Sequence, residues 1–142
     1  MSNPPRSDAP PLSQSLTPEE REHGTYFAPK FDSAGLLSAI VVDAATKDVL
    51  VAAFMNEEAL AKTRSTGKVH FWSRSRGSLW LKGETSGNFL LVEEVWVDCD
   101  QDALVIHATP AGPTCHTGAK SCFYRRLDLR VDDVTALVRV KT

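Results

Sequence analysis

Residues 38–54 read SAIVVDAATKDVLVAAF, and this stretch decides the class of fold. Two short apolar runs rich in β-branched residues, 38–42 and 49–54, flank the turn-like polar segment 43–48. Short runs of this composition, bounded by turn-forming residues, predict two β-strands with a short connection between them. We therefore expect a protein built on a β-sheet, in which these two strands follow each other directly.

The segments on either side of this stretch add helices and further strands. Downstream, residues 56–62 predict a helix, because Asn56 can cap its first turn and Gly67 lies just past its end. Upstream, Thr17 followed by Pro18 and two glutamates predicts the start of a short helix. Four more strands are predicted, at residues 69–72, 78–81, 89–97 and 103–108.

Together these elements predict a single α+β domain. We expect about six short strands in a mostly antiparallel twisted sheet or pseudo-barrel, with one or two short helices, because most strands follow one another through short connections. The tail 128–140 is ambiguous, although Asp132-Asp133 would suit the start of a short helix. Residues 1–16 are rich in proline and serine, so we expect a disordered leader before a domain at 17–142.

Bulk composition narrows the class of protein. The chain has 142 residues, enough for one domain, and its net charge of −2 makes no electrostatic case for binding nucleic acid. No apolar stretch approaches the roughly 20 residues needed to cross a membrane, and the first residues lack the apolar core of a secretory signal. With three cysteines, a complete disulfide framework within one chain is excluded. We expect a cytoplasmic protein with reduced cysteines, which there more often bind metal.

Three cysteines lie within a short part of the chain, at Cys99, Cys115 and Cys122. Zinc prefers thiolate and imidazole ligands, and three protein ligands leave its fourth position open, as catalytic sites require. The sequence therefore predicts a catalytic zinc site. Two alternatives remain open at this point: inert buried cysteines, and a structural zinc site that takes its fourth ligand from His116.

Three aspartates surround the first cysteine, at Asp98, Asp100 and Asp102. In an extended chain this spacing of two places all three carboxylates on one side, with Cys99 on the other. Converging carboxylates repel each other, and Mg²⁺ would relieve this repulsion, because it binds carboxylates together with phosphate oxygens. A magnesium site is predicted, and the alternative is a solvated hairpin turn.

The histidines differ in context. His116 directly follows a predicted zinc ligand, where it could take a proton from water and return it to a leaving nitrogen. His70 lies in the aromatic run 69–72, and is either a structural histidine or a second site residue. His23 and His107 have no distinctive neighbours, so we expect both at the surface.

Two polar segments could bind phosphate. Residues 73–76 combine two arginines with two serines, and residues 82–88 form a loop with two glycines and hydroxyl side chains. Arginine binds phosphate through two parallel hydrogen bonds, and backbone N–H groups of glycine-containing loops can cradle it. The alternative for these segments is a basic solvated hairpin.

Four stretches of the chain resemble the phosphoribosyl-AMP cyclohydrolases of histidine biosynthesis. Together they cover about residues 35–125, and the last two are highly specific as a pair. They are AFMNEEAL (53–60), FWSRSR (71–76) with LWLKGETSGN (79–88), DCDQDAL (98–104), and GPTCHTG (112–118) with SCF (121–123).

This resemblance implies an enzyme that hydrolyses the N1–C6 bond of the adenine ring of 1-(5-phosphoribosyl)-AMP, giving the formimino-aminoimidazole carboxamide ribonucleotide intermediate of histidine biosynthesis. It also implies an intertwined homodimer with one Zn²⁺ per subunit, bound by three cysteines of which one comes from the partner chain. Carried onto this sequence, the zinc ligands are Cys99, Cys115 and Cys122, and the Mg²⁺ ligands are Asp98, Asp100 and Asp102.

The remaining expectations combine the resemblance with the chemistry of the residues. Zinc lowers the pKa of bound water to about 7, and His116 is the expected catalytic proton shuttle. The expected substrate-binding residues are Ser73, Arg74, Arg76, Thr85, Ser86, Gly87, Asn88 and His70. Neither nucleic acid nor a membrane is expected as a partner. A non-catalytic, zinc-stabilised binding module is the alternative function.

Overall fold

The computed structural model describes residues 16–130 and 136–140. The leader expected at 1–16 therefore lies outside the described residues except for Leu16, as does the helix start considered at Asp132-Asp133. The elements, in chain order, are α1 (Pro18–His23), β1 (Leu37–Asp43), β2 (Val49–Met55), α2 (Glu57–Thr66), β3 (His70–Ser73), β4 (Ser78–Leu81), β5 (Leu90–Val97), β6 (Ala103–Pro110), β7 (Arg125–Leu127) and β8 (Leu137–Arg139).

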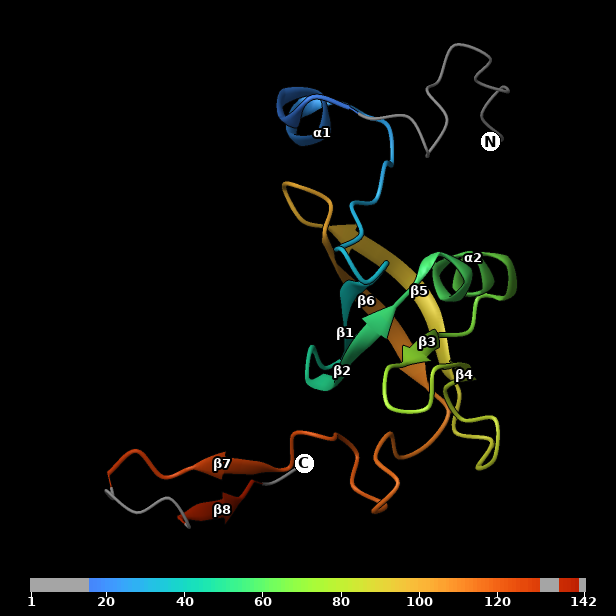
Figure 1. Cartoon of the computed structure of the whole chain (residues 1–142). Helices are drawn as coiled ribbons and strands as arrows, with labels where there is room; N and C mark the ends of the chain where they lie inside the picture. Colours follow the sequence, from blue (N-terminus) through green and yellow to red (C-terminus); the bar gives the residue numbers. More distant parts are fainter. Residues whose placement is uncertain (1–15, 131–135, 141–142) are drawn as a thin grey trace.

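Six strands form one curled mixed sheet in the order β4-β3-β2-β1-β6-β5, and β7 pairs with β8 in a separate hairpin (Figure 1). The α+β class and the main strands and helices predicted from sequence are confirmed. The sheet is mostly antiparallel, as expected, because four of its five neighbouring strand pairs are antiparallel; the exception is β1, which pairs in parallel with β6. Residues 44–102, which contain β2 to β5, form the long crossover that a parallel pair requires.

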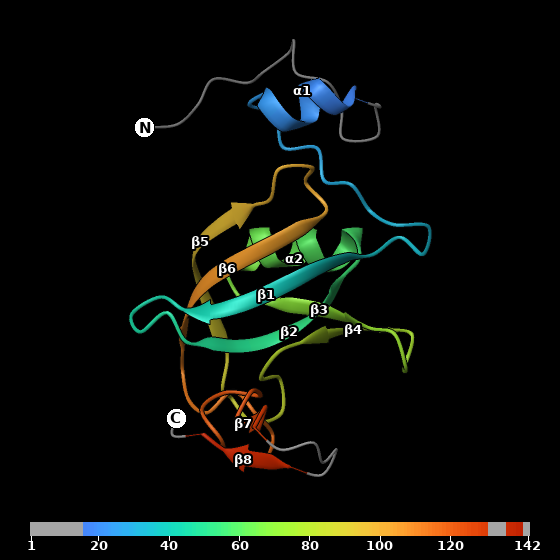
Figure 2. The same cartoon turned by 90° about the vertical axis from the view of Figure 1, so that its left-hand side faces the viewer.

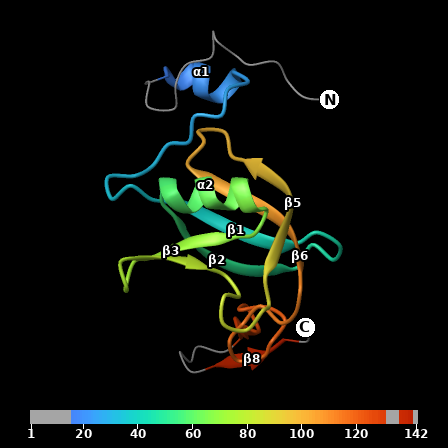
Figure 3. The same cartoon turned by 90° about the vertical axis from the view of Figure 1, so that its right-hand side faces the viewer.

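Helix α2 covers the concave face of the sheet (Figures 2 and 3). Asn56 caps it by accepting a hydrogen bond from the N–H of Ala59, and Gly67 ends it in the left-handed conformation at φ 73°. Its buried residues, Ala59, Leu60 and Thr63, contact a core whose largest fully buried side chains include Phe71 and Met55. No described element lies over the other face of β1, β2 and β6, which is turned to the viewer in Figure 2.

The turn between β5 and β6 holds the N-terminal segment in place. Gln101 is buried, and its side-chain oxygen accepts a hydrogen bond from the N–H of Ala28 at 2.8 Å. Its amide nitrogen donates to the carbonyl oxygens of Arg21 and Tyr26, at 2.9 and 3.1 Å. The segment that connects α1 to β1 is therefore fastened to the turn that carries the three aspartates.

At the opposite end of the sheet, the loop after β6 is fastened to β2. The hydroxyl of Ser121 donates to the carbonyl of Val49 at 2.6 Å, and the N–H of Cys122 donates to the carbonyl of Leu50 at 2.8 Å. These bonds fix the loop 111–122 at the end of the sheet from which the β7–β8 hairpin leaves (Figures 1 and 2).

Candidate metal and substrate site

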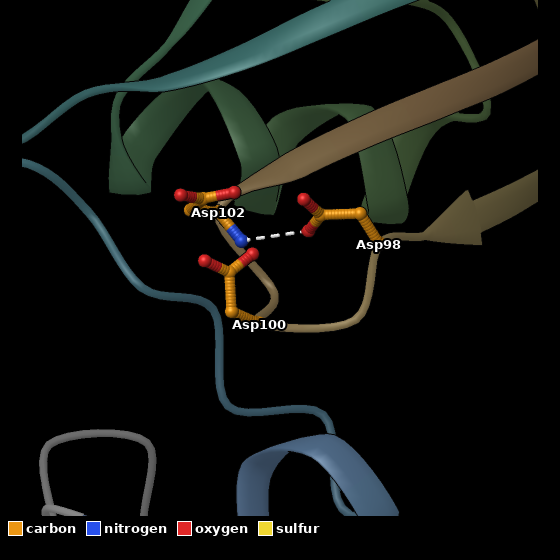
Figure 4. A group of neighbouring side chains, drawn as sticks. All are labelled: Asp98, Asp100 and Asp102. Atoms are coloured by element: carbon orange, nitrogen blue, oxygen red, sulfur yellow. Dashed lines mark hydrogen bonds between the residues drawn. The ribbon is translucent and has the colours of Figure 1, made fainter. Parts of the chain in front are cut away.

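The carboxylates of Asp98, Asp100 and Asp102 converge in the turn between β5 and β6 (Figure 4). One oxygen from each lies within 4.8 Å of the others. The sequence predicts this convergence on the assumption that residues 98–102 form an extended chain, and that assumption is wrong. The residues form a turn, with Gln101 in the left-handed region at φ 60°, and Asp98 Oδ1 accepts hydrogen bonds from the N–H groups of Asp102 and Ala103, at 2.9 and 3.1 Å.

The three carboxylates of this cluster repel one another, which would favour a bound cation. The pKa of Asp102 is raised to about 6, because its carboxyl group hydrogen-bonds Asp98 and Asp100 and is repelled by both charges. Burial raises the pKa of Asp98, but hydrogen bonds from Asp102 and from backbone N–H groups outweigh it, and the net pKa is lowered. Among the described residues, no lysine, arginine or histidine forms an ion pair with these carboxylates. A hard divalent cation would supply the missing positive charge.

Cys115 and Cys122 lie together in the loop fastened to β2. A hydrogen bond from the Thr117 hydroxyl to Cys115 Sγ, at 3.1 Å, is the main reason that the pKa of Cys115 is lowered. Burial, followed by the charge of Cys115, raises the pKa of Cys122. Gly118, at φ 90°, gives the loop the tight turn that carries Cys115 and Thr117. The pair supplies two converging soft ligands.

Cys99 lies at the other end of the sheet from this pair. It is exposed in the turn that precedes β6, whereas Cys115 follows β6. The eight residues of β6 span about 23 Å at a rise of roughly 3.3 Å per residue. Because a zinc–sulfur bond is about 2.3 Å long, the three thiols of one chain cannot bind one ion.

Lys82 is a residue that the sequence reasoning did not single out. It is buried at 9% exposure at the end of β4, and its ammonium group lies 5.2 Å from the centre of the Trp80 ring. Its charge lowers the pKa of both Cys115 and Cys122. The only signal in the sequence was its place in the polar segment 82–88, because proximity to the cysteines depends on the tertiary fold.

The predicted phosphate-binding residues divide into two groups. Ser73, Arg74 and Arg76 line one hollow of about 720 Å³ together with Trp72 and Trp80. The loop 85–88 lies elsewhere, against the segment that leads to Cys115: a Cβ atom added at Gly112 would collide with the side chain of Asn88. The structure thus brings the arginines together in one hollow and places the loop 85–88 beside the cysteine loop.

The histidines have different surroundings. His116 and His23 are exposed, which confirms the expectation for His23. His70 is buried, and its Nδ1 hydrogen-bonds the Lys68 carbonyl oxygen at 2.8 Å, which fits the structural alternative. The expectation that His107 is a surface residue is wrong. It is 5% exposed, because the Trp96 side chain lies against it with ring centres 4.5 Å apart.

An apolar hollow of about 410 Å³ lies between α2 and the β5–β6 pair, lined by residues such as Phe27 and Val95. It contains none of the predicted site residues. No helix in the described ranges is long and apolar enough to span a membrane.

Comparison with known proteins identifies the family. The family model described as phosphoribosyl-AMP cyclohydrolase matches residues 51–124. The relative of that name from Erythrobacter litoralis is 62% identical over 113 residues, which cover 80% of this chain and 90% of the relative. The relative from Sphingopyxis alaskensis is 59% identical, covering 78% and 87%, and that from Brucella anthropi is 52% identical, covering 82% and 84%.

The matched region contains both converging clusters and Cys99. The relatives' shared name describes a hydrolase that acts on a cyclic carbon–nitrogen bond. The chain is such a hydrolase, and it belongs to the phosphoribosyl-AMP cyclohydrolase family.

Proposed function

We propose that this protein hydrolyses the N1–C6 bond of the adenine ring of 1-(5-phosphoribosyl)-AMP and so opens the purine in histidine biosynthesis. The observation that carries the proposal is the pairing of a soft two-thiol cluster with a hard three-carboxylate cluster at opposite ends of one sheet. The name of the relatives supports this substrate.

The donor atoms fit Zn²⁺ at the cysteines. Cys115 and Cys122 would bind the ion from one chain, and Cys99 would complete the set from a second chain, because Cys99 of the same chain is too far away. Zinc bound there would lower the pKa of a water molecule to about 7 and polarise the reacting carbon. Lys82 would offset part of the negative charge that three thiolates bring together.

This arrangement supports a homodimer. A two-fold axis would place the Cys99 end of each sheet next to the Cys115 end of its partner, which gives two identical sites. Large exposed apolar side chains flank both halves of the proposed zinc site: Trp96, at 56% exposure, precedes Cys99 on β5, and Phe123, at 54%, follows Cys122. Such residues are typical of a surface that is covered in an assembly.

The three aspartates fit Mg²⁺, which would bind substrate phosphate oxygens alongside their carboxylates. Arg74 and Arg76 would bind phosphate from the neighbouring hollow.

His116 would move the proton. Its exposed imidazole follows Cys115 directly, so it would lie at the site where water adds to C6. A ring nitrogen would take a proton from that water and deliver it to N1 as the C6–N1 bond breaks.

A direct test measures metal content and turnover together. The purified protein is analysed for zinc and then incubated with phosphoribosyl-AMP and Mg²⁺, and ring opening is followed by absorbance. We expect zinc-dependent turnover. Bound zinc without ring opening would favour the alternative of a non-catalytic, zinc-stabilised module, and turnover of AMP or adenosine in a parallel panel would indicate a different purine substrate.

A further inference from the structure

The side chain of Phe54 lies between two hollows. On one side is the arginine hollow described above, and on the other is a hollow of about 230 Å³ that includes Asp102 and Lys30. Phe54 lines both, and is half-buried. A single side chain therefore connects the predicted phosphate-binding arginines with the predicted magnesium cluster.

The register of the sheet explains this placement. Ala103 on β6 pairs with Ser38 on β1, Ser38 pairs with Phe54 on β2, and Phe54 pairs with Trp72 on β3. These four paired residues form a row across the sheet, which begins at the residue after Asp102 and ends at Trp72, two residues before Arg74. The magnesium cluster and the arginines thus lie at the same end of the sheet, whereas Cys115 and Cys122 of the same chain lie at the other end.

Arg74 is held against Phe54 in a way that leaves its hydrogen-bond donors free. Its guanidinium carbon lies 4.1 Å from the centre of the Phe54 ring. Within the described part of the chain, it has neither an ion pair nor a hydrogen bond. A guanidinium group stacked on a ring keeps its N–H groups at its edge, where they can bind phosphate through two bonds.

The charge of the arginine hollow also favours an anion. Arg76 also lies over an aromatic ring, with its guanidinium carbon 5.8 Å from the centre of the Trp80 ring. Among the residues that the structure describes, no acidic side chain lines this hollow, so the two positive charges are not compensated by them. Arg76 Nε donates a hydrogen bond to Ser73 Oγ at 3.4 Å, whereas Arg74, over the described ranges, keeps all its donors free. Guanidinium groups over aromatic rings, without a carboxylate, suit a phosphate group better than they suit a protein ion pair.

We propose that Phe54 is a substrate-positioning residue, whose ring fixes Arg74 between the two hollows so that its guanidinium and the Asp102 magnesium site bind the same phosphate group of the nucleotide. This inference rests on the proposed function for the identity of the nucleotide. Phe54 itself touches no reacting atom in this scheme and acts through Arg74. The ring face is the essential feature, so tyrosine should replace phenylalanine and leucine should not.

The first test is kinetic. Phe54→Leu should raise the KM for phosphoribosyl-AMP by about fivefold to tenfold with little change in kcat, as expected for loss of a cation–π contact. Phe54→Tyr should restore the wild-type KM. The matched control is Phe27→Leu, because Phe27 lies outside both hollows. Its ring also lies beneath an arginine, with the guanidinium carbon of Arg64 5.5 Å from the ring centre. Equal KM values for Phe54→Leu and wild type, or a loss confined to kcat, would contradict the proposal.

A double-mutant cycle tests whether Phe54 acts through Arg74. Arg74 is exposed, so Arg74→Met should leave the fold intact even where Phe54→Leu lowers stability. In the Arg74→Met background, Phe54→Leu should have no further effect on KM, because the contact it removes is already gone. Additive effects of the two substitutions would show that Phe54 acts independently of Arg74.

Binding of AMP separates this inference from the proposed function. Trp72 and Trp80 line the arginine hollow, so their fluorescence should report AMP binding in the presence of Mg²⁺ without any turnover. AMP affinity that falls about fivefold in Phe54→Leu would support the inference even for a protein that does not open phosphoribosyl-AMP. If the protein turns over phosphoribosyl-AMP but neither its KM nor its AMP affinity changes in Phe54→Leu, the proposed function stands and the inference is contradicted. The inference is also contradicted if the wild-type protein binds no AMP.

Discussion

The thiols of Cys115 and Cys122 lie side by side, yet their pKa values are shifted in opposite directions. Thr117 donates a hydrogen bond to Cys115 and favours its thiolate, whereas burial disfavours the thiolate of Cys122. Cys115 therefore loses its proton more readily than Cys122, and a bound cation would favour the thiolate of both. In the proposed zinc site, this difference would make Cys115 the first ligand.

Substitutions at Cys115 and His116 should separate metal binding from proton transfer. Cys115→Ala should abolish both zinc binding and activity, because it removes the favoured thiolate. His116→Ala should keep zinc and lower kcat by a factor of about 10² to 10⁴, the usual contribution of a general acid–base. Zinc content by atomic absorption and kcat by absorbance check both results. Loss of zinc from His116→Ala would instead make His116 a ligand.

At the aspartate cluster, protons and Mg²⁺ should compete. The pKa of Asp102 is raised to about 6 by Asp98 and Asp100, so the metal-free cluster holds a proton between about pH 4 and 6 that the unfolded chain has already released. Raising the pH through this window should weaken the metal-free fold and strengthen Mg²⁺ binding, which levels off above pH 6. Calorimetric titrations with Mg²⁺ at several pH values test this. Asp102→Asn should remove the pH dependence, and an unchanged dependence would exclude Asp102 as its source.

At the scale of elements, the sequence predicted the strands and helices better than their pairing. Local signals place β1, β2 and α2: β-branched runs around a turn, and Asn56 and Gly67 at the ends of the helix. The parallel contact between β1 and β6 joins segments about 60 residues apart in the chain, so no local pattern reports it. His107, in contrast, was predicted wrongly although the strand that contains it was predicted correctly. It lies inside the strand predicted at residues 103–108, so a local pattern was present that is compatible with its burial.

The features of the candidate site also divide into those set by the local sequence and those set by the tertiary fold. The convergence of three carboxylates within five residues is a local property, and the sequence predicted it correctly. The burial of Lys82 near the cysteines and the placement of Phe54 beside Asp102 depend on contacts between distant segments. The separation of Cys99 from the other cysteines likewise depends on the extended strand β6, which lies between the two loops.

The turn between β5 and β6 should contribute to the stability of the element that it fastens. Gln101→Ala removes three buried or part-buried hydrogen bonds to the N-terminal segment, which should lower the free energy of unfolding by about 2–4 kcal/mol. Asn56→Ala, which removes only a helix cap, should cost about 1 kcal/mol and serves as the reference. Chemical denaturation measures both. An equal or smaller effect for Gln101→Ala would show that the segment is held in another way.

At the scale of the whole molecule, each end of the sheet carries an incomplete part of the proposed site. The end with Cys99 has the carboxylates and the arginines, and the end with Cys115 and Cys122 has the second and third thiols and His116. The single chain separates these ends by the length of β6, about 23 Å. In an antiparallel pair of sheets related by a two-fold axis, the Cys99 end of each chain lies beside the Cys115 end of the other, so the proposed zinc sites are complete only in the dimer.

Mixing two inactive variants tests this requirement. If each zinc ion takes Cys99 from one chain and Cys115 from the other, Cys99→Ala and Cys115→Ala should each be inactive alone. A heterodimer of the two variants contains one site with both substitutions and one site with neither. Co-refolding equal amounts, so that half of the dimers are mixed, should therefore restore about one quarter of the wild-type activity and zinc content. The matched control, Cys115→Ala co-refolded with Cys122→Ala, should restore nothing, because both substitutions affect the same end and every site lacks a thiol. Recovery in the control, or none in the first mixture, would contradict a zinc site shared between Cys99 of one chain and the cysteine pair of the other.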